Sequence, residues 1–199
     1  MLAGGQARRL GGRDKALMRL DPDTTLLAAL LGRIGGQCGA LAISANGDPA
    51  RFAAAGRPVL ADEPGPSRGP LAGVLAGLAH AAAHVPGRWM LTVPGDTPFV
   101  PTDLAERLAV AARSAGRPVA RATCAGRLHS LVALWSPTLE APLREALLGR
   151  DLRKVTAFQA EVGVADVPWA ATPHDPFFNV NTLEDLATAR AIQADLHRG

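Results

Sequence analysis

The chain has 199 residues, 48% of them hydrophobic, and a formal net charge of +3. It contains no run near the roughly 20 apolar residues of a membrane-spanning helix and no recognisable secretory leader, so we expect a cytoplasmic protein without a membrane partner. Its two cysteines, Cys38 and Cys124, lack a metal-type spacing to histidine, which argues against a disulfide framework or a zinc site. The scattered positive charge suits an anionic small substrate as well as nucleic acid and alone does not decide between them.

The first half of the chain alternates short apolar runs with helical patterns. Runs bounded by Gly, Pro or Asp predict buried strands at 40–44, 58–61 and 89–93. Apolar spacing predicts helices at 24–34, at 71–83 after Pro70, and at 103–114 with Thr102 as N-cap and Glu106 extending a capping box. This alternation implies a parallel sheet with right-handed crossovers.

The pattern loosens after Gly116 but continues without a linker or repeat. It predicts strands at 118–122, 128–135 and 162–167, and helices at 139–148, 152–160 and 183–196, the last capped by Thr182. We therefore expect one α/β domain over residues 1–199. Its ligand site should lie where loops leave the carboxyl ends of the parallel strands.

Residues 2–17, LAGGQARRLGGRDKAL, combine glycines with basic side chains at the very start of the chain. Glycines let backbone amides approach phosphate oxygens closely, and Arg9 and Lys15 add positive charge. The spacing fits neither the Walker loop nor the dinucleotide fingerprint. A flexible glycine-rich tail is the alternative interpretation.

A carboxylate follows the apolar strand at 89–93. Asp96 stands in PGDTP, residues 94–98, directly beyond that strand. Magnesium prefers such hard oxygen ligands and commonly bridges one or two carboxylates to substrate phosphates. A helix cap or a turn is the alternative role for this residue.

These motifs occur together with others in a specific order along nearly the whole chain. The series is LAGG at 2–5, Arg9, Gly11, Asp14-Lys15, Asn46, Asp62, GPLAG at 69–73, PGDTP at 94–98 and FNVNT at 178–182. Together they closely resemble the molybdenum cofactor guanylyltransferases. The resemblance implies an α/β, Rossmann-like nucleotidyltransferase fold, a three-layer sandwich with a mostly parallel central sheet.

The same resemblance implies the reaction and its participants. These enzymes transfer GMP from GTP to the terminal phosphate of molybdopterin, form the guanine dinucleotide cofactor and release pyrophosphate. The implied cofactor is Mg²⁺, and the implied partners are GTP, molybdopterin or the molybdenum cofactor, and cofactor-delivery proteins, without nucleic acid.

Site residues carry over from the resemblance motif by motif. It assigns nucleotide binding to Leu2, Ala3, Gly4, Gly5, Lys15, Asn46, Asp62 and Asp96, catalysis to Arg9, Lys15 and Asp96, the metal to Asp96, and the pterin phosphate to Asn179 and Asn181. The chemistry agrees, since cations neutralise a triphosphate and an ionised Asp62 accepts from guanine N–H groups or a sugar hydroxyl. A structural Asp62 at a strand end and a turn at Asn179 and Asn181 are the alternatives.

The sequence differs from the usual family pattern at two places, and two alternative functions remain open. The family usually has His-Pro where this chain has His129-Ser130, and it has a hydrophobic strand before LAGG, so we expect the native chain to begin upstream of Met1. A related nucleotidyltransferase, such as a molybdopterin cytidylyltransferase or a sugar-phosphate enzyme, is one rival. Cytidylyltransferases typically have LAAG in place of LAGG. The other rival is a non-catalytic nucleotide-binding module.

Overall fold

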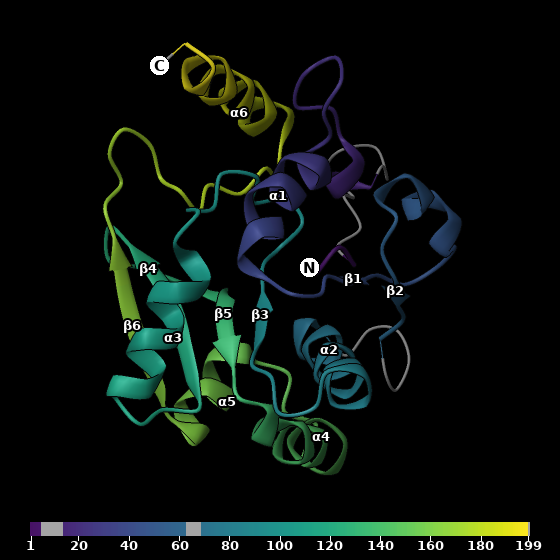
Figure 1. Ribbon diagram of the computed structural model, residues 1–199, viewed down its shortest axis with the longest axis vertical. Helices are drawn as coiled ribbons and strands as arrows, with labels where there is room; N and C mark the ends of the chain where they lie inside the picture. The colour runs from purple at the N-terminus through teal and green to yellow at the C-terminus, as the bar shows by residue number, and fades with distance from the viewer. Residues whose placement is uncertain (5–13, 63–68, 199) are drawn as a thin grey trace.

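The computed structural model describes residues 1–4, 14–62 and 69–198 (Figure 1). The strands are β1 (Ile43–Ser44), β2 (Val59–Leu60), β3 (Met90–Thr92), β4 (Val119–Cys124), β5 (Arg127–Trp135) and β6 (Val164–Trp169). The α-helices are α1 (Leu26–Ile34), α2 (Pro70–His84), α3 (Leu104–Ser114), α4 (Glu140–Gly149), α5 (Val155–Val162) and α6 (Leu183–Leu196). Short 3-10 helices occur at η2 (Lys15–Leu17), η3 (Gly35–Gln37), η4 (Pro49–Ala55) and η5 (Pro137–Leu139).

The central sheet is built from two parts joined by Leu2. β1 and β2 form a parallel pair, and β3, β5, β4 and β6 form a four-stranded sheet in that order. Leu2 lies between the two parts and makes parallel bridges to Ser44 on one side and to Pro94 on the other. Pairing is therefore parallel throughout except where β5 meets β3 and β4, which confirms the mostly parallel sheet.

The alternation of strands and helices did not predict that β5 is antiparallel. β4 and β5 are joined by Ala125 and Gly126, whose φ angles are +47° and +76°. Two residues with positive φ form the tight turn that matches the twist of paired antiparallel strands. The predicted strands at 118–122 and 128–135 are thus the two arms of one hairpin, in which β4 extends to Cys124.

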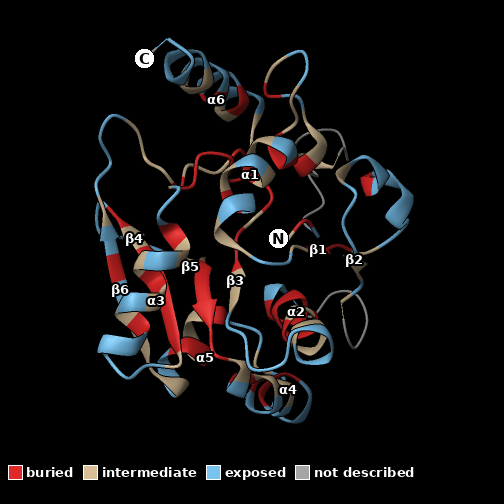
Figure 2. Cartoon of the chain, in the orientation of Figure 1, coloured by how far each residue is buried: buried red, intermediate tan, exposed pale blue. Residues whose placement is uncertain are grey.

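Helices cover both faces of the sheet, and the buried residues form a separate core on each face (Figure 2). One core packs α1 and α3 against the sheet, and the other packs α2, α4 and α5 against the opposite face. β5 contributes to both, because Val132 and Leu134 enter the first core while Ala133 and Trp135 enter the second. This arrangement is the expected three-layer sandwich.

The predicted N-cap of α3 was wrong. Its N-cap is Asp103, not Thr102, and no side-chain hydrogen bond caps the helix from that position. The side chain of Gln37 takes this role from η3, since its Oε1 accepts from the backbone N–H of Ala105 at 2.9 Å. Its Nε2 donates to the carbonyl of Pro101 at 2.9 Å. A side chain that is distant in the sequence therefore supplies the hydrogen bond that caps the N-terminus of α3.

The C-terminal segment returns to the carboxyl ends of the strands. α6 begins at the predicted Thr182, which forms a capping box with Asp185. The helix packs Leu186 and Ala189 beside Phe99 and Val180, and the backbone N–H of Val180 donates to the carbonyl of Asp96 at 3.0 Å. The FNVNT segment therefore lies against PGDTP. Within the described part of the chain, no helix is long and apolar enough to cross a membrane.

A buried polar network holds an irregular part of β5. The pairing with β4 shifts register between Arg121, opposite Ala133, and Ala122, opposite His129. The carbonyl of Leu131 accepts from the hydroxyl of Thr92 at 2.8 Å, and that hydroxyl also accepts from Trp135 Nε1 at 2.8 Å. The hydroxyl of Thr92, which is 3% exposed, therefore pairs both with the buried Trp135 indole and with a carbonyl in the irregular part of β5.

We expect Thr92→Val to destabilise the fold although it preserves side-chain shape. The substitution leaves the Trp135 Nε1 donor and the Leu131 carbonyl without this partner, and it should lower the free energy of unfolding by about 2 kcal/mol. In a chain of this size that corresponds to a fall in Tm of about 4–8 °C. Thr92→Ser, which keeps the hydroxyl, is the matched control, and a Val variant more stable than the Ser variant would contradict the prediction.

Candidate active site

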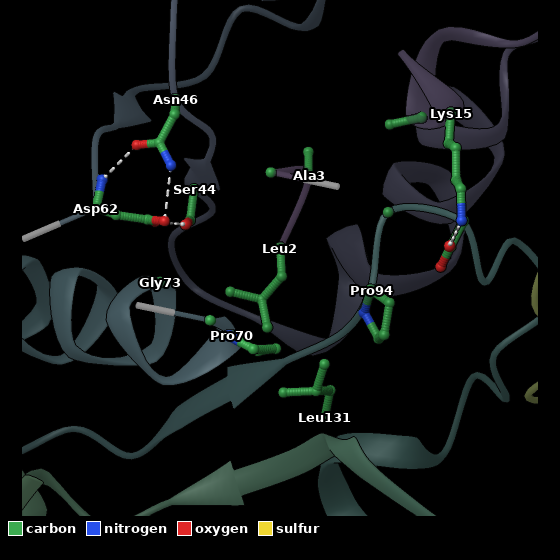
Figure 3. Close-up of a pocket in the computed structure, with 15 residues that line it drawn as sticks. Leu2, Ala3, Lys15, Ser44, Asn46, Asp62, Pro70, Gly73, Pro94 and Leu131 are labelled. Carbon is green, nitrogen blue, oxygen red and sulfur yellow. Dashed lines mark hydrogen bonds and ion pairs between the residues drawn. The ribbon is translucent and has the colours of Figure 1, made fainter. Parts of the chain in front are cut away.

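A cavity of about 390 Å³ opens where β1, β2 and β3 end (Figure 3). Its lining includes the predicted site residues Leu2, Ala3, Gly4, Lys15, Asn46, Asp62 and Asp96. The remaining lining residues are Ala16, Ser44, Gly69, Pro70, Gly73, Pro94, Gly95 and Leu131. Gly5 and Arg9, also predicted, lie outside the described residues.

Asn46 and Asp62 form one wall of the cavity as a reciprocally bonded pair. Asn46 Nδ2 donates to Asp62 Oδ2 at 2.7 Å, and the backbone N–H of Asp62 donates to Asn46 Oδ1 at 3.0 Å. Ser44 Oγ donates to the other carboxylate oxygen of Asp62 at 3.2 Å (Figure 3). Because β1 and β2 are parallel, the residues just beyond their carboxyl ends meet at one edge of the sheet.

Lys15 and Asp96 lie on the opposite side of Leu2 and Ala3. Lys15 Nζ is 3.6 Å from Asp96 Oδ2, and the two side chains are 21% and 17% exposed. Asp96 is held by a turn in which the N–H of Thr97 donates to the carbonyl of Pro94 at 3.2 Å. Figure 3 shows Lys15 separated from the Asn46–Asp62 pair by the Leu2–Ala3 backbone.

Asn179 and Asn181 reach the Lys15–Asp96 pair from the segment before α6. Asn179 Nδ2 donates to Asp96 Oδ1 at 3.0 Å and to Thr97 Oγ1 at 2.9 Å. Lys15 Nζ donates to Asn181 Oδ1 at 2.6 Å. Both asparagines therefore contact the same cluster, as expected if their side chains share one side of an extended segment.

Glycine at position 95 permits a close approach of three chain segments. A Cβ added there would lie 3.1 Å from Ala16 Cβ, 3.5 Å from Ala3 Cβ and 3.5 Å from the carbonyl oxygen of Leu2. The N–H of Gly95 donates to that same carbonyl at 2.9 Å. The PGDTP turn is thereby packed directly against the start of the chain.

Two carboxylates, Asp62 and Asp96, line the cavity and provide hard oxygen donors. Asp62 is already engaged by Asn46 and Ser44, whereas Asp96 faces Lys15 and Asn179. Among the described residues no group of three or more His, Cys, Asp or Glu side chains is gathered. Any cation here would thus need further oxygens from a ligand.

Sequence reasoning missed Ser44 and Leu131 as residues of this site. Ser44 had a usable signal, because it is a lone hydroxyl at the end of an apolar run. Leu131 had none, since the register shift beside β4 that precedes it is a tertiary feature. His129, whose role the missing Pro put in doubt, does not line the cavity; its ring packs 4.9 Å from the ring of Phe177.

A second hollow of about 980 Å³ lies beside β3 and α2. It is larger than the cavity described above, but among the described residues Leu2 is the only predicted site residue in its lining. The residues in the two linings therefore favour the smaller cavity as the candidate active site.

Comparison with known proteins identifies the family of the chain. A family model described as the MobA-like NTP transferase domain matches residues 1–163. The chain belongs to this family. It is 51% identical over 193 residues to a molybdenum cofactor guanylyltransferase of Rhodopseudomonas palustris strain HaA2, covering 96% of this chain and 90% of that protein. The enzyme of the same description from Rhodobacter capsulatus is 46% identical over 189 residues, covering 95% and 92%.

Solved structures of MobA-like and related transferases share the fold. The molybdopterin-guanine dinucleotide biosynthesis protein A of Archaeoglobus fulgidus superposes with a TM-score of 0.75 at 22% identity, covering 98% of this chain and 97% of that one. A nucleotidyl transferase of Methanothermobacter thermautotrophicus gives a TM-score of 0.73 at 17% identity, covering 98% and 96%. The predicted nucleotidyltransferase fold is confirmed.

We expect His129 to make the fold of this MobA-like protein sensitive to acid. Burial lowers the pKa of His129, which is 7% exposed, so the unfolded chain binds a proton here more readily than the folded chain. The stability contributed by a neutral His129 is present above its ordinary pKa of about 6.5 and is lost as pH falls through the lowered folded value. Burial also lowers the pKa of His80 and His174, which act in the same direction.

The measurement is the change in Tm between about pH 7.5 and about pH 5. His129→Gln should lose less Tm over this range than the wild type, because it removes one proton-binding difference between the states. The same substitution at the exposed His197 is the control. Equal losses in the two variants would show that burial of His129 does not govern the acid response.

Proposed function

We propose that this chain transfers GMP from GTP to the terminal phosphate of molybdopterin, forming the guanine dinucleotide cofactor and releasing pyrophosphate. One observation carries the proposal: the predicted nucleotide residues that are described line a single cavity, and both predicted pterin-side asparagines contact its Lys15–Asp96 pair. Curated relatives with this described function are 42–51% identical to the chain in five examples.

Lys15 and Asp96 suit the phosphate end of the cavity. Phosphoryl-type transfer depends on positioning and on positive charge where negative charge develops, more than on covalent help from protein. The Lys15 ammonium, 2.6 Å from Asn181 Oδ1, is a compact donor held at the cavity wall and can neutralise phosphate oxygens. Arg9, outside the described residues, is proposed as a second cation.

Mg²⁺ fits the donor set at Asp96. Asn179 fixes one carboxylate oxygen of Asp96, and the other faces Lys15, so a hard oxygen ligand is oriented at the cavity. Magnesium is commonly bound by one or two carboxylates plus substrate phosphates, which suits a site with few protein carboxylates. When bound beside Asp96, magnesium would supply positive charge that offsets the negative charge of the phosphates.

Asn46 and Asp62 suit guanine. Each carboxylate oxygen of Asp62 accepts one hydrogen bond within the protein and keeps further acceptor capacity for guanine N–H groups. Cytosine does not present the adjacent ring and exocyclic N–H donors of guanine. A site built around buried polar groups rejects a base that leaves those groups unpaired. The wall therefore supports selectivity for GTP.

The deciding experiment incubates the protein with GTP, magnesium and molybdopterin and detects the dinucleotide and pyrophosphate by mass. CTP and ATP in parallel reactions test the base. GTP should be used in clear preference. Equal turnover of CTP would favour a cytidylyltransferase, and binding of GTP without turnover would favour a non-catalytic module.

Asp96→Asn should abolish transfer far more than it weakens the fold. The amide keeps the size of the side chain but is a poor magnesium ligand and removes the charge that holds the ion. We expect kcat to fall about 100-fold or more, equivalent to about 2.7 kcal/mol of lost transition-state stabilisation, with a near-normal Tm. The control is Asp103→Asn at the exposed start of α3. Near-normal transfer by Asp96→Asn at saturating magnesium would remove this residue from the metal site.

A substitution at Gly73, a lining residue on α2, tests the role of the Asp62 wall. A Cβ on Gly73 in α2 would lie 2.6 Å from Ser44 Oγ and 3.3 Å from Asp62 Oδ1, so these groups must shift. We expect Gly73→Ala to raise the Kd for GTP by about tenfold, or about 1.4 kcal/mol.

Gly77, one helical turn further along α2, provides a matched control for Gly73. Its added Cβ would meet the flexible end of Met90, at 2.7 Å from Sδ, which can move aside. Gly77→Ala should therefore keep the GTP affinity of the wild type in the same titration. Equal affinities for the two variants would contradict the proposed role of the Asp62 wall.

A further inference from the structure

Arg51 lies outside the cavity lining but contacts the lining residue Asn46 and Asp14, the residue before Lys15. The residue belongs to η4, whose Phe52 is buried in a core with Ile43 and Ala45. Arg51 Nε is 2.8 Å from Asp14 Oδ2, and Arg51 Nη2 donates to the backbone carbonyl of Asn46 at 2.5 Å. One guanidinium therefore joins the residue before Lys15 to the residue that holds Asp62.

Asp14 directly precedes η2 and pairs with Arg51. Asp14 occupies the N-cap position of η2, but its side chain makes no capping hydrogen bond there. The carboxylate instead pairs with Arg51, while the carbonyl of Asp14 accepts from the N–H of Leu17 at 3.1 Å. Lys15 is the next residue, so the ion pair lies one residue from the start of η2.

The Asp14–Arg51 ion pair is partly buried. The Asp14 and Arg51 side chains are 17% and 33% exposed. Burial raises the pKa of Asp14, and the positive charge of Arg51 acts against that rise. The positive charge of Arg51 thus favours the ionised form of this partly buried carboxylate.

The contact to Asn46 depends on a glycine. Gly47, the next residue, has a φ of +86°, which favours glycine, and a Cβ added there would lie 3.3 Å from Arg51 Nη1. The chain therefore turns away from β1 in a way that lets the guanidinium lie against the Asn46 backbone. The guanidinium also lies 4.9 Å from the centre of the Phe52 ring, which restricts its position.

We propose that Arg51 is a positioning residue that sets the distance between Lys15 at the phosphate end and Asn46 at the base end of the nucleotide cavity. The role rests on the proposed guanylyl transfer. A planar guanidinium donates in two fixed directions at once, which the point charge of a lysine does not reproduce. Misplacement of a reacting group by about 1 Å costs about 100-fold in rate, so a small change at Arg51 should be visible in kinetics.

The experiment compares Arg51→Met, Arg51→Lys and Asp14→Asn with the control Arg57→Met, which changes an exposed arginine just after η4. For each variant we measure Tm, the Kd of GTP by direct titration, and kcat and KM for GTP. Arg51→Met and Asp14→Asn should each raise Kd and lower kcat by about tenfold, with Tm close to that of the control, because partly exposed ion pairs add little stability. Arg51→Lys should recover part of the loss.

The double variant Asp14→Asn with Arg51→Met separates positioning from independent damage. If the two residues act through one contact, the double variant should be no worse than the more affected single variant. Additive losses, or kinetics of Arg51→Met equal to those of Arg57→Met, would overturn the proposal. Absence of GMP transfer in the wild type would instead defeat the proposed reaction, while the GTP titrations would still test Arg51.

Discussion

Hydrogen bonds along the backbone from Met1 to Ala3 hold the two parts of the sheet in register. Leu2 donates to the carbonyl of Val93 at 2.9 Å and accepts from the N–H of Gly95 at 2.9 Å. Ala3 donates to the carbonyl of Ser44 at 2.8 Å, and the N–H of Ser44 donates to the carbonyl of Met1 at 2.7 Å. Since Asn46 and Asp62 follow one part and Asp96 follows the other, these few bonds fix the strand ends that carry the three side chains.

The two walls carry different chemistry because they are held by different partners. Around Asp62 the contacts are amide and hydroxyl donors, which leave acceptor capacity facing the cavity. Around Asp96 the contacts are an ammonium group and an amide from a segment far along the chain. In both walls, contacts within the protein orient the polar groups, and fixed polar groups of this kind are what electrostatic preorganisation requires.

Local signals in the sequence predicted a large part of this structure. α6 was predicted with both of its ends, since Thr182 and Asp185 form a capping box within the helix itself. The cavity residues were assigned from the family resemblance, and Asn46, Asp62 and Asp96 among them follow strands whose carboxyl ends the fold brings together. The cap on α3 was missed because Gln37 lies on η3, with no spacing rule linking it to Ala105. Arg51 was missed for the same reason, because its partners Asp14 and Asn46 are neighbours only in the folded chain.

The contact between Lys15 and Asn181 also has a consequence for the order of events during protein synthesis. The two residues are 166 positions apart, and at about 5–20 residues per second the ribosome needs roughly 8 to 33 seconds to make that interval. Over this time Lys15 has been made but the asparagine that orients it has not, and Asp96 lacks Asn179 in the same way. A nascent chain can therefore form most of the sheet before the asparagines that contact Lys15 and Asp96 have been made.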